Sequence, residues 1–332
     1  MTLPPLLKLL ADGQLYSGED LARELNVSRA AVWKGVERLR GHGIEVQAVA
    51  RRGYRLQCPV ELLDAPRLTA ALGSVRSSQV RTLEILFEVD STNSRLLGAD
   101  PPPYGYADVV LSELQHAGRG RRGRPWIAPF GGSLAMSVGW SFRDSARALP
   151  SLSLGVGVAI SRALVRAGAS NVGLKWPNDI LFNDRKLGGV LIELKAEASG
   201  PAFVVIGVGL NCWLDSAARR RVEATGVRVA ALADACADGA APSRNRVAGF
   251  IADEILTMVA EFETQGFAPL RAAWERLDAL RGREVQVLLG EVATRGKACG
   301  VDEDGALMLE VGDKMRKFVS GEVTLRFGED LN

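Results

Sequence analysis

A short stretch rich in glycine and arginine carries the clearest chemical signal, because residues 117–126 read AGRGRRGRPW. Its glycines match the G-x-G-x-x-G spacing of a dinucleotide-binding turn, which must lead directly into a helix. Pro125 and Pro129 follow instead, and no helical pattern begins before Ser151, so that interpretation fails. An RNA-binding arginine–glycine segment is a second alternative, but such segments usually repeat and lie in tails. The remaining interpretation is a pliable cationic loop that binds an anion such as a nucleotide phosphate.

Four guanidinium groups crowd this loop, those of Arg119, Arg121, Arg122 and Arg124. Their mutual repulsion and the entropy of the glycines predict a loop that is mobile without a ligand. An anionic ligand would screen the repulsion and order the loop. Such a loop can admit substrates, close over them and shield a reactive acyl phosphate from water.

A second stretch points to the same chemistry, since residues 175–194 read KWPNDILFNDRKLGGVLIEL. Lys186 stands just before the paired glycines Gly188 and Gly189, which let a ligand approach the backbone closely. The lysine ammonium group would supply a point charge beside that ligand. The alternative is that NDRK is a polar hairpin turn and KWPND a surface loop, with no binding role.

Together these stretches resemble the motifs of biotin–protein ligases. Residues 91–93 (STN), 118–126, 175–179 (KWPND), 186–189 (KLGG) and 207–211 (GVGLN) occur in the order of that family. The arginine loop and the KWPND–KLGG pair are specific, whereas STN or GVGLN alone is weak. One departure is Ala128, where relatives often have serine, which puts one local hydrogen bond in doubt. Taken with the N-terminal segment described below, the whole chain resembles the bifunctional form, biotin–[acetyl-CoA-carboxylase] ligase and biotin operon repressor.

This resemblance implies a two-step reaction. Biotin and ATP, with Mg²⁺, would give biotinoyl-5′-AMP, and a lysine of a biotin carboxyl carrier protein would then accept the biotin. Attack of a carboxylate on a triphosphate requires charge neutralisation and alignment rather than a histidine base. The resemblance also implies binding of operator DNA by a homodimer that biotinoyl-5′-AMP induces.

The resemblance further assigns site residues in three overlapping groups. The catalytic group is Lys186, Arg121 and Asp179, where Lys186 would bridge the carboxylate and the α-phosphate and Asp179 would help to activate the incoming lysine. The biotin group is Ser91, Thr92, Asn93, Gln115, Gly118, Arg119, Arg121, Lys186 and Gly189. The nucleotide group is Arg121, Arg122, Arg124, Trp126, Asn178 and Asn211. Structural roles compete with these: Trp126 or Trp176 as core aromatics, Asn211 as a turn cap, and Ser91 as a helix N-cap.

The N-terminal segment, residues 1–58, has the pattern of a winged helix-turn-helix. Leucines at helical spacing indicate a first helix, Ser17 and Ser28 are N-caps for a second and a third, and an alternating hairpin follows around Arg51. The segment carries nine Lys/Arg and six Asp/Glu, a net charge of 9 − 6 = +3. The residues expected at DNA are Ser28, Arg29, Ala30, Lys34, Arg51 and Arg52. The alternative is a protein-docking module, and Trp33 is expected to pack in a core or between domains.

The rest of the chain divides into three further segments. Residues 59–79 are expected to form a linker and a short helix. Residues 80–278 alternate seven strand patterns with two helical patterns (151–168 and 245–266), which predicts an α+β catalytic domain with a mixed sheet. Residues 279–332 predict an SH3-like β-barrel from short strands joined by glycine turns. The fold class is therefore α+β, with several domains.

Composition limits the function classes. The 332 residues are 47% hydrophobic and 24% charged, and no apolar run is long enough to span a bilayer, which predicts a cytoplasmic protein without a membrane partner. The four cysteines are far apart and the only histidines are His42 and His116, so no metal site is expected from spacing. Three alternatives stay open: a lipoate–protein ligase, a ligase whose winged helix does not repress, and a regulator that senses the adenylate without transferring it.

Overall fold

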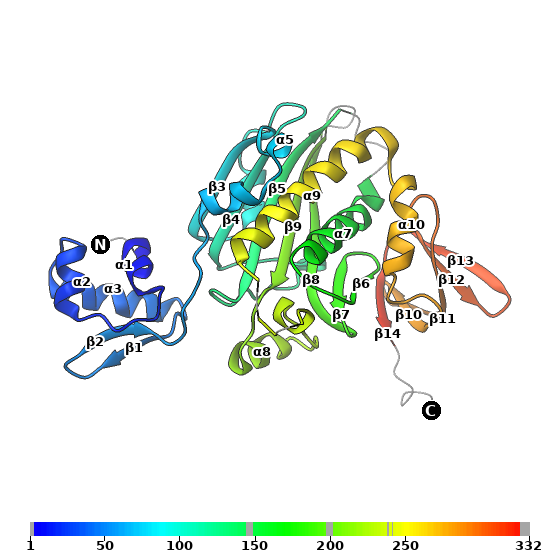
Figure 1. Ribbon diagram of the computed structural model, residues 1–332. Helices are drawn as coiled ribbons and strands as arrows, with labels where there is room; N and C mark the ends of the chain where they lie inside the picture. Colours follow the sequence, from blue (N-terminus) through cyan, green and yellow to red (C-terminus); the bar gives the residue numbers. More distant parts are fainter. Residues whose placement is uncertain (1–2, 144–148, 197–201, 238, 241, 326–332) are drawn as a thin grey trace.

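The computed structural model describes residues 3–143, 149–196, 202–237, 239–240 and 242–325. A small helical unit, a central sheet covered by long helices, and a second, smaller sheet follow one another along the chain (Figure 1). Within those ranges, no helix has both the length and the apolar character needed to cross a membrane.

The N-terminal unit is the expected winged helix-turn-helix. Its elements are α1 (Leu3–Leu10), α2 (Gly18–Glu24), α3 (Arg29–Gly41), β1 (Val46–Val49) and β2 (Gly53–Leu56). The Ser17 side chain accepts the N–H of Asp20, and that of Ser28 accepts the N–H of Ala31, so both expected caps are formed. Four of the five leucines of α1 are buried against α3 and the hairpin. A serine cap thus begins α2 and α3, and α1 is held by its apolar face.

The central sheet is mixed, as expected. Its order is β3-β4-β5-β9-β8-β7-β6, and only the β3–β4 pair is parallel. The strands span Val80–Val89 (β3), Ala107–Gln115 (β4), Ser133–Phe142 (β5), Val172–Lys175 (β6), Asp179–Phe182 (β7), Arg185–Ala196 (β8) and Ala202–Asn211 (β9). The parallel pair arises because a short helix, α6 (Thr92–Leu97), carries the chain from the end of β3 back towards the start of β4.

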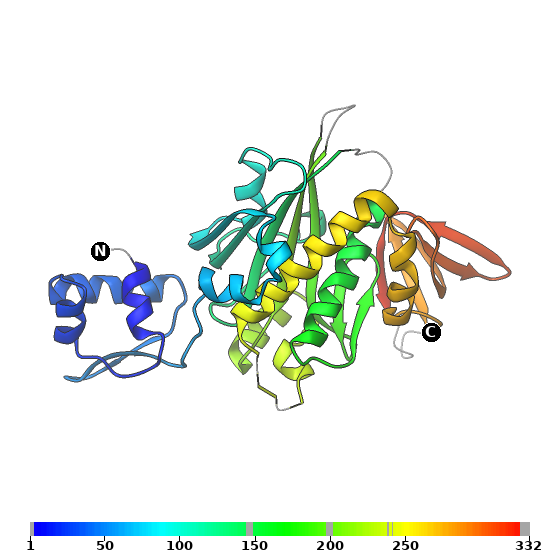
Figure 2. The same cartoon turned by 45° about the horizontal axis from the view of Figure 1, so that its top comes forward.

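Two long helices cover one face of this sheet (Figure 2). They are α7 (Leu149–Arg166) and α9 (Arg244–Gln265), which match the two helical patterns in the sequence. Alternate residues of β5 and β9, such as Met136 and Ile206, point into the core beneath them. Shorter helices surround this layer: α4 (Ala65–Ala71), α5 (Ser74–Ser77), α8 (Ser216–Glu223) and α10 (Ala268–Leu277). On the opposite face, α6 packs through Leu96 against Val110 and Val205.

The C-terminal strands form a five-stranded antiparallel sheet of order β13-β12-β11-β10-β14. They span Glu284–Leu289 (β10), Val292–Val301 (β11), Leu307–Val311 (β12), Lys314–Phe318 (β13) and Glu322–Leu325 (β14). This agrees with the expected SH3-like architecture, although no ladder joins the edge strands β13 and β14 within residues 284–325. The sheet packs on the central domain through Trp176, whose Nε1–H donates to Gly305 O at 3.1 Å. Trp176 is therefore a core aromatic, the structural role that competed for it.

The segment between the winged helix and the sheet is anchored by a buried ion pair. Arg244, at the start of α9, lies 2.8 Å from Glu113 of β4, and each side chain is at most 6% exposed. Arg244 also donates to the main-chain oxygen of Glu61, and Glu113 accepts the N–H of Leu63. The backbone of residues 61–63 is thus bonded directly to the core of the central domain.

Candidate functional site

The floor of the candidate site is a row of residues with short side chains that crosses the sheet. The strand registers pair Ala135 with Gly209, Gly209 with Gly189, and Gly189 with Asp179. A neighbouring row pairs Ser137 with Gly207. Because directly paired residues project to the same face, these positions leave space above the sheet on the face away from α7 and α9.

The arginine loop folds down onto this floor. Its ends are joined where the Trp126 N–H donates to Gly118 O at 2.8 Å, and the Gly120 N–H donates to Arg124 O at 2.7 Å. The Trp126 ring covers Gly209, where a Cβ would lie 2.4 Å from Trp126 Cε2. Only glycine at that position leaves room for the indole.

Asn93 occupies the neighbouring position on the floor. A Cβ at Gly207 would lie 2.4 Å from Asn93 Oδ1, so this glycine also leaves space for a site side chain. Asn93 Nδ2 donates to Glu193 Oε2 at 2.7 Å, and Arg119 Nη2 lies 3.2 Å from Glu193 Oε1. Ser137, fully buried, has its hydroxyl 2.6 Å from Asn93 Oδ1. Both the nitrogen and the oxygen of the Asn93 side-chain amide are therefore hydrogen-bonded.

The remaining expected biotin residues lie beside Asn93. Ser91 is the N-cap of α6, as its competing role predicted, and Thr92 begins that helix. Gln115, at the end of β4, accepts the Thr92 N–H at 2.9 Å. An added Cβ at Gly118 would lie 3.1 Å from Gln115 Nε2, so Gln115 also reaches the base of the arginine loop. These residues form one continuous wall of the site.

Lys186 lies near the Trp126 ring and is held by Asp179. Its Nζ is 5.8 Å from the ring centroid and 2.6 Å from Asp179 Oδ1, and Lys175 Nζ is 3.3 Å from Asp179 Oδ2. Burial by itself would raise the pKa of Asp179, but the charges of Lys186 and Lys175 outweigh it and leave that pKa below its usual value. Asp179 is thus ionised at neutral pH. The ionised carboxylate can hold the Lys186 ammonium group, but its lowered pKa makes Asp179 a weak base.

The loop arginines contact the C-terminal sheet. Arg124 forms an ion pair with Glu322, Arg122 Nη1 lies 3.7 Å from Glu322 Oε1, and Arg121 Nη1 donates to Gly321 O at 3.3 Å. Burial lowers the pKa of Arg121, and the nearby charge of Arg122 lowers it further. The predicted repulsion among the guanidinium groups is therefore partly compensated by Glu322, a carboxylate that the sequence argument for mobility did not include.

Two buried polar atoms at the site, Trp126 Nε1 and Asn211 Oδ1, have no hydrogen-bond partner among the residues that the structure describes. Asn211 is 1% exposed, and its Nδ2 donates to Ala230 O at 3.1 Å. The Ala230 N–H in turn donates to Lys186 O at 2.9 Å, which connects Asn211 to the backbone of Lys186. Asn178 bonds instead to the main-chain oxygen of Val190 at 2.7 Å. Buried donors and acceptors are usually satisfied, so these two atoms are available to a polar ligand.

The residues expected at biotin and nucleotide are therefore brought together from the start of α6, the end of β4, the arginine loop, the turn before β7, and the strands β7, β8 and β9. Sequence reasoning missed Ser137, Glu193 and Glu322, which contact site residues from distant parts of the chain. The spacing of Gly207 and Gly209 was a usable signal, since glycines two apart in a strand leave two gaps on one face.

The residues expected at DNA form a separate surface on the winged helix. Ser28, the N-cap of α3, and Arg29, Ala30 and Lys34 on that helix are exposed, as are Arg51 and Arg52 at the tip of the hairpin. Within the described chain, none of the four cationic side chains forms an ion pair. The expectation for Trp33 was wrong as far as the described chain goes, because this side chain is 53% exposed on α3 and packs in no core.

Comparison with family models agrees with this division of the chain. Residues 6–55 match an HTH domain, residues 88–211 the biotin/lipoate A/B protein ligase family, and residues 281–326 the biotin protein ligase C-terminal domain.

Curated relatives match along nearly the whole chain. The bifunctional ligase/repressor BirA of Escherichia coli K12 is 37% identical, over 98% of this chain and 97% of that protein. The Bacillus subtilis protein of the same name is 29% identical, over 95% of each. Among solved structures, a biotin protein ligase from Aquifex aeolicus in complex with biotin and ATP has a TM-score of 0.62 and 28% identity. The match covers 74% of this chain and 99% of that one.

Proposed function

The chain belongs to the family of bifunctional biotin ligase/repressors, and on that basis we propose that it is an ATP-dependent biotin–protein ligase. It forms biotinoyl-5′-AMP and then transfers the biotin to a lysine of a biotin carboxyl carrier protein. The observation that carries this proposal is Lys186, held by Asp179 beside the Trp126 ring on a floor of residues with short side chains.

In this proposal the biotin lies along the wall formed by Ser91, Thr92, Asn93, Gln115 and Gly118, with its carboxylate directed at Lys186. The Lys186 ammonium group offsets negative charge on the carboxylate and on the α-phosphate as they approach, which is where charge repulsion opposes the first step. Gly189 lies directly beneath, since a Cβ there would be 3.5 Å from Lys186 Nζ. Asp179 acts through Lys186 by holding the ammonium group in place.

In the same proposal the nucleotide binds beside Trp126 and Asn211. The unpaired Trp126 Nε1 and Asn211 Oδ1 are a donor and an acceptor suited to a polar ligand edge. Arg121, Arg122 and Arg124 would then exchange their contacts with Gly321 and Glu322 for phosphate oxygens.

We propose that Mg²⁺ enters with ATP. The carboxylates paired with the loop or with Lys186 are Glu193, Glu322 and Asp179, each bound to cationic side chains. The described residues offer no group of three metal-ligating side chains at this site. Mg²⁺ commonly keeps phosphate oxygens and water as most of its ligands, which fits so few free carboxylates.

Release of pyrophosphate that depends on both ATP and biotin tests the ligase. Lys186→Ala should lower this release by about a hundredfold, because a charge at the reacting centre is lost. The matched control is Lys195→Ala, an exposed lysine on the same strand, which should leave the rate unchanged. Equal rates for the two variants would contradict the role of Lys186. Release with lipoate in place of biotin would favour the lipoate ligase alternative.

We further propose that the winged helix binds operator DNA and represses biotin synthesis genes. Arg29 and Lys34 would face the major groove or its phosphates, and Arg51 and Arg52 the adjacent backbone. The double variant Arg29→Ala/Lys34→Ala should lose operator binding in a mobility-shift assay and keep its ligase activity. Unchanged operator affinity would contradict the assignment of α3 as the recognition helix.

A symmetric operator requires two copies of the chain, and we propose that biotinoyl-5′-AMP induces the dimer. Sedimentation velocity with and without the adenylate measures this directly. A monomer at all adenylate concentrations would remove the proposed coupling and leave the ligase proposal intact.

A further inference from the structure

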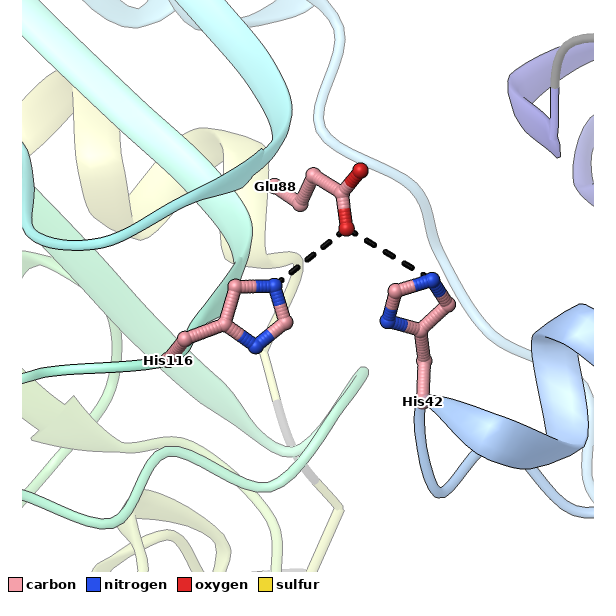
Figure 3. Close-up of side chains that lie close together, drawn as sticks. All are labelled: His42, Glu88 and His116. Carbon is pink, nitrogen blue, oxygen red and sulfur yellow. Dashed lines mark hydrogen bonds and ion pairs between the residues drawn. The ribbon is translucent and has the colours of Figure 1, made fainter.

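The two histidines of the chain, His42 and His116, come together between the winged helix and the central sheet. His42 is the C-cap of α3, and His116 follows the last residue of β4. Glu88 of β3 lies between them (Figure 3). We propose that these three side chains bind a divalent transition metal ion, with Zn²⁺ as the type, and that the bound ion ties the winged helix to the catalytic domain.

The distances fit a metal ion of this size. Glu88 Oε2 lies 3.2 Å from His116 Nε2 and 3.5 Å from His42 Nε2, and all three ligand atoms lie within 4.8 Å of one another. A tetrahedral Zn²⁺ with bonds of about 2.0–2.1 Å separates neighbouring ligand atoms by about 3.3 Å. The two nitrogen–oxygen separations lie on either side of that value, and the two imidazole nitrogens lie within 4.8 Å of each other, so side-chain rotations complete the site.

The donor set selects the class of ion. Two imidazole nitrogens and one carboxylate oxygen suit Zn²⁺ and its transition-metal neighbours, whereas Mg²⁺ and Ca²⁺ favour oxygen ligands alone. The side chains of His42, Glu88 and His116 are 22%, 43% and 49% exposed, so an ion can reach them from solvent. Water would fill the remaining coordination position.

The backbone holds the ligands in place before any ion binds. The His42 N–H caps the end of α3 by donating to Arg38 O at 3.1 Å, and the His116 N–H donates to Val89 O at 3.0 Å. The His42 ring also packs edge-on against Phe87, with the ring centroids 6.0 Å apart. Metal binding therefore requires side-chain adjustment and no rearrangement of the main chain.

The expectation that the chain has no metal site rested on local spacing, which cannot detect this cluster. Glu88 is 28 residues from His116, and His42 belongs to a different unit of the fold. Since His42 follows the recognition helix directly, an ion at this position would fix the orientation of that helix relative to the ligase domain.

Calorimetric titration of Zn²⁺ into the untagged, metal-free full-length chain tests the site. One ion should bind per chain, and His42→Gln, Glu88→Gln and His116→Gln should each weaken binding by about tenfold or more. The matched control Glu84→Gln removes the same charge from the same strand and should bind like the parent. Cys58→Ser should also bind like the parent, which separates the site from the exposed thiol. No binding by the parent, or equal binding by all variants, would overturn the proposal.

Nuclear magnetic resonance tests whether the ion bridges the two units. Because the chain has only two histidines, selective labelling of histidine gives two ring resonances, which the single-histidine variants assign. A stoichiometric amount of Zn²⁺ should shift both. A shift of one resonance alone would mean that the ion binds one unit and does not tie the two together.

Discussion

The indole ring of Trp126 lies directly against the α-carbon of Gly209, and a Cβ at that position would be 2.4 Å from the ring. The contact between Trp126 and Gly209 therefore fixes the position of the arginine loop on the sheet. Lys186 Nζ, which Asp179 holds, lies 5.8 Å from the centroid of the same ring.

Substitution of this glycine should displace the tryptophan. In Gly209→Ala the new methyl group would push the ring off the sheet, and we expect pyrophosphate release with biotin and ATP to fall by about a hundredfold. The control is Gly41→Ala, whose Cβ would meet nothing within 4 Å. Parent-like activity of Gly209→Ala would show that the position of Trp126 is immaterial to the reaction.

The role of Asp179 can be resolved by separating the two reaction steps. Because its pKa is held below the usual value by Lys186 and Lys175, we expect it to position Lys186 and not to take a proton. Asp179→Asn should then slow adenylate formation about tenfold to a hundredfold in the absence of any carrier protein. A normal first step with a slow transfer from preformed adenylate would instead favour a role in activating the incoming lysine.

Loss of the Glu322 charge should loosen the arginine loop. Glu322→Gln removes the partner of Arg122 and Arg124, a contribution of about 1 kcal/mol for a half-exposed pair, which corresponds to about fivefold in the open population. Limited digestion with trypsin should then cut more quickly after Arg121 and Arg122, and ATP with biotin should slow it again. Glu291→Gln, an exposed carboxylate of the same domain, is the control. Equal cleavage of the two variants would argue against the Glu322 contacts.

The buried carboxyl group of Asp278 predicts a pH-dependent stability. Burial raises its pKa to about 6, while the unfolded chain titrates near 3.9. The folded state therefore binds the proton more tightly, and its stability falls as the pH rises from about 4 through 6, after which the penalty stays constant. Asp278→Asn should exceed the parent in free energy of unfolding by about 1–2 kcal/mol at pH 8, with a smaller gap at pH 5. Urea unfolding at both pH values measures the gap, and exposed Asp313→Asn should show none.

The sequence predicts those parts of the site that depend on neighbours along the chain. The arginine loop, the KWPND and KLGG motifs and the helix caps at Ser17 and Ser28 are local patterns, and the structure places each at the expected kind of element. The two long helices were also predictable, because each has an extended apolar pattern. The short helix α6 was indicated only by Ser91 as a possible N-cap, and the short helices α8 and α10 were not predicted.

Partners that meet only through the tertiary fold could not be predicted. Glu193 is 100 residues from Asn93, and Gly321 is 200 residues from Arg121, so no spacing rule connects them. The same holds for Ser137, whose buried hydroxyl resembles any other serine in a strand until the register places it opposite Gly207. Electrostatic arguments from the sequence alone overestimated the repulsion in the loop for this reason.

The buried ion pair between Arg244 and Glu113, with the Glu61 backbone bonded to the same guanidinium group, has a consequence for engineering. If the winged helix were transplanted onto a ligase without Glu113 and Arg244, the linker between the two units would not be anchored to the central domain. Such a hybrid would present its recognition helix to DNA without a fixed orientation relative to the ligase domain. Transplanting Glu61, Glu113 and Arg244 together with the winged helix would keep the orientation of the recognition helix relative to the ligase domain.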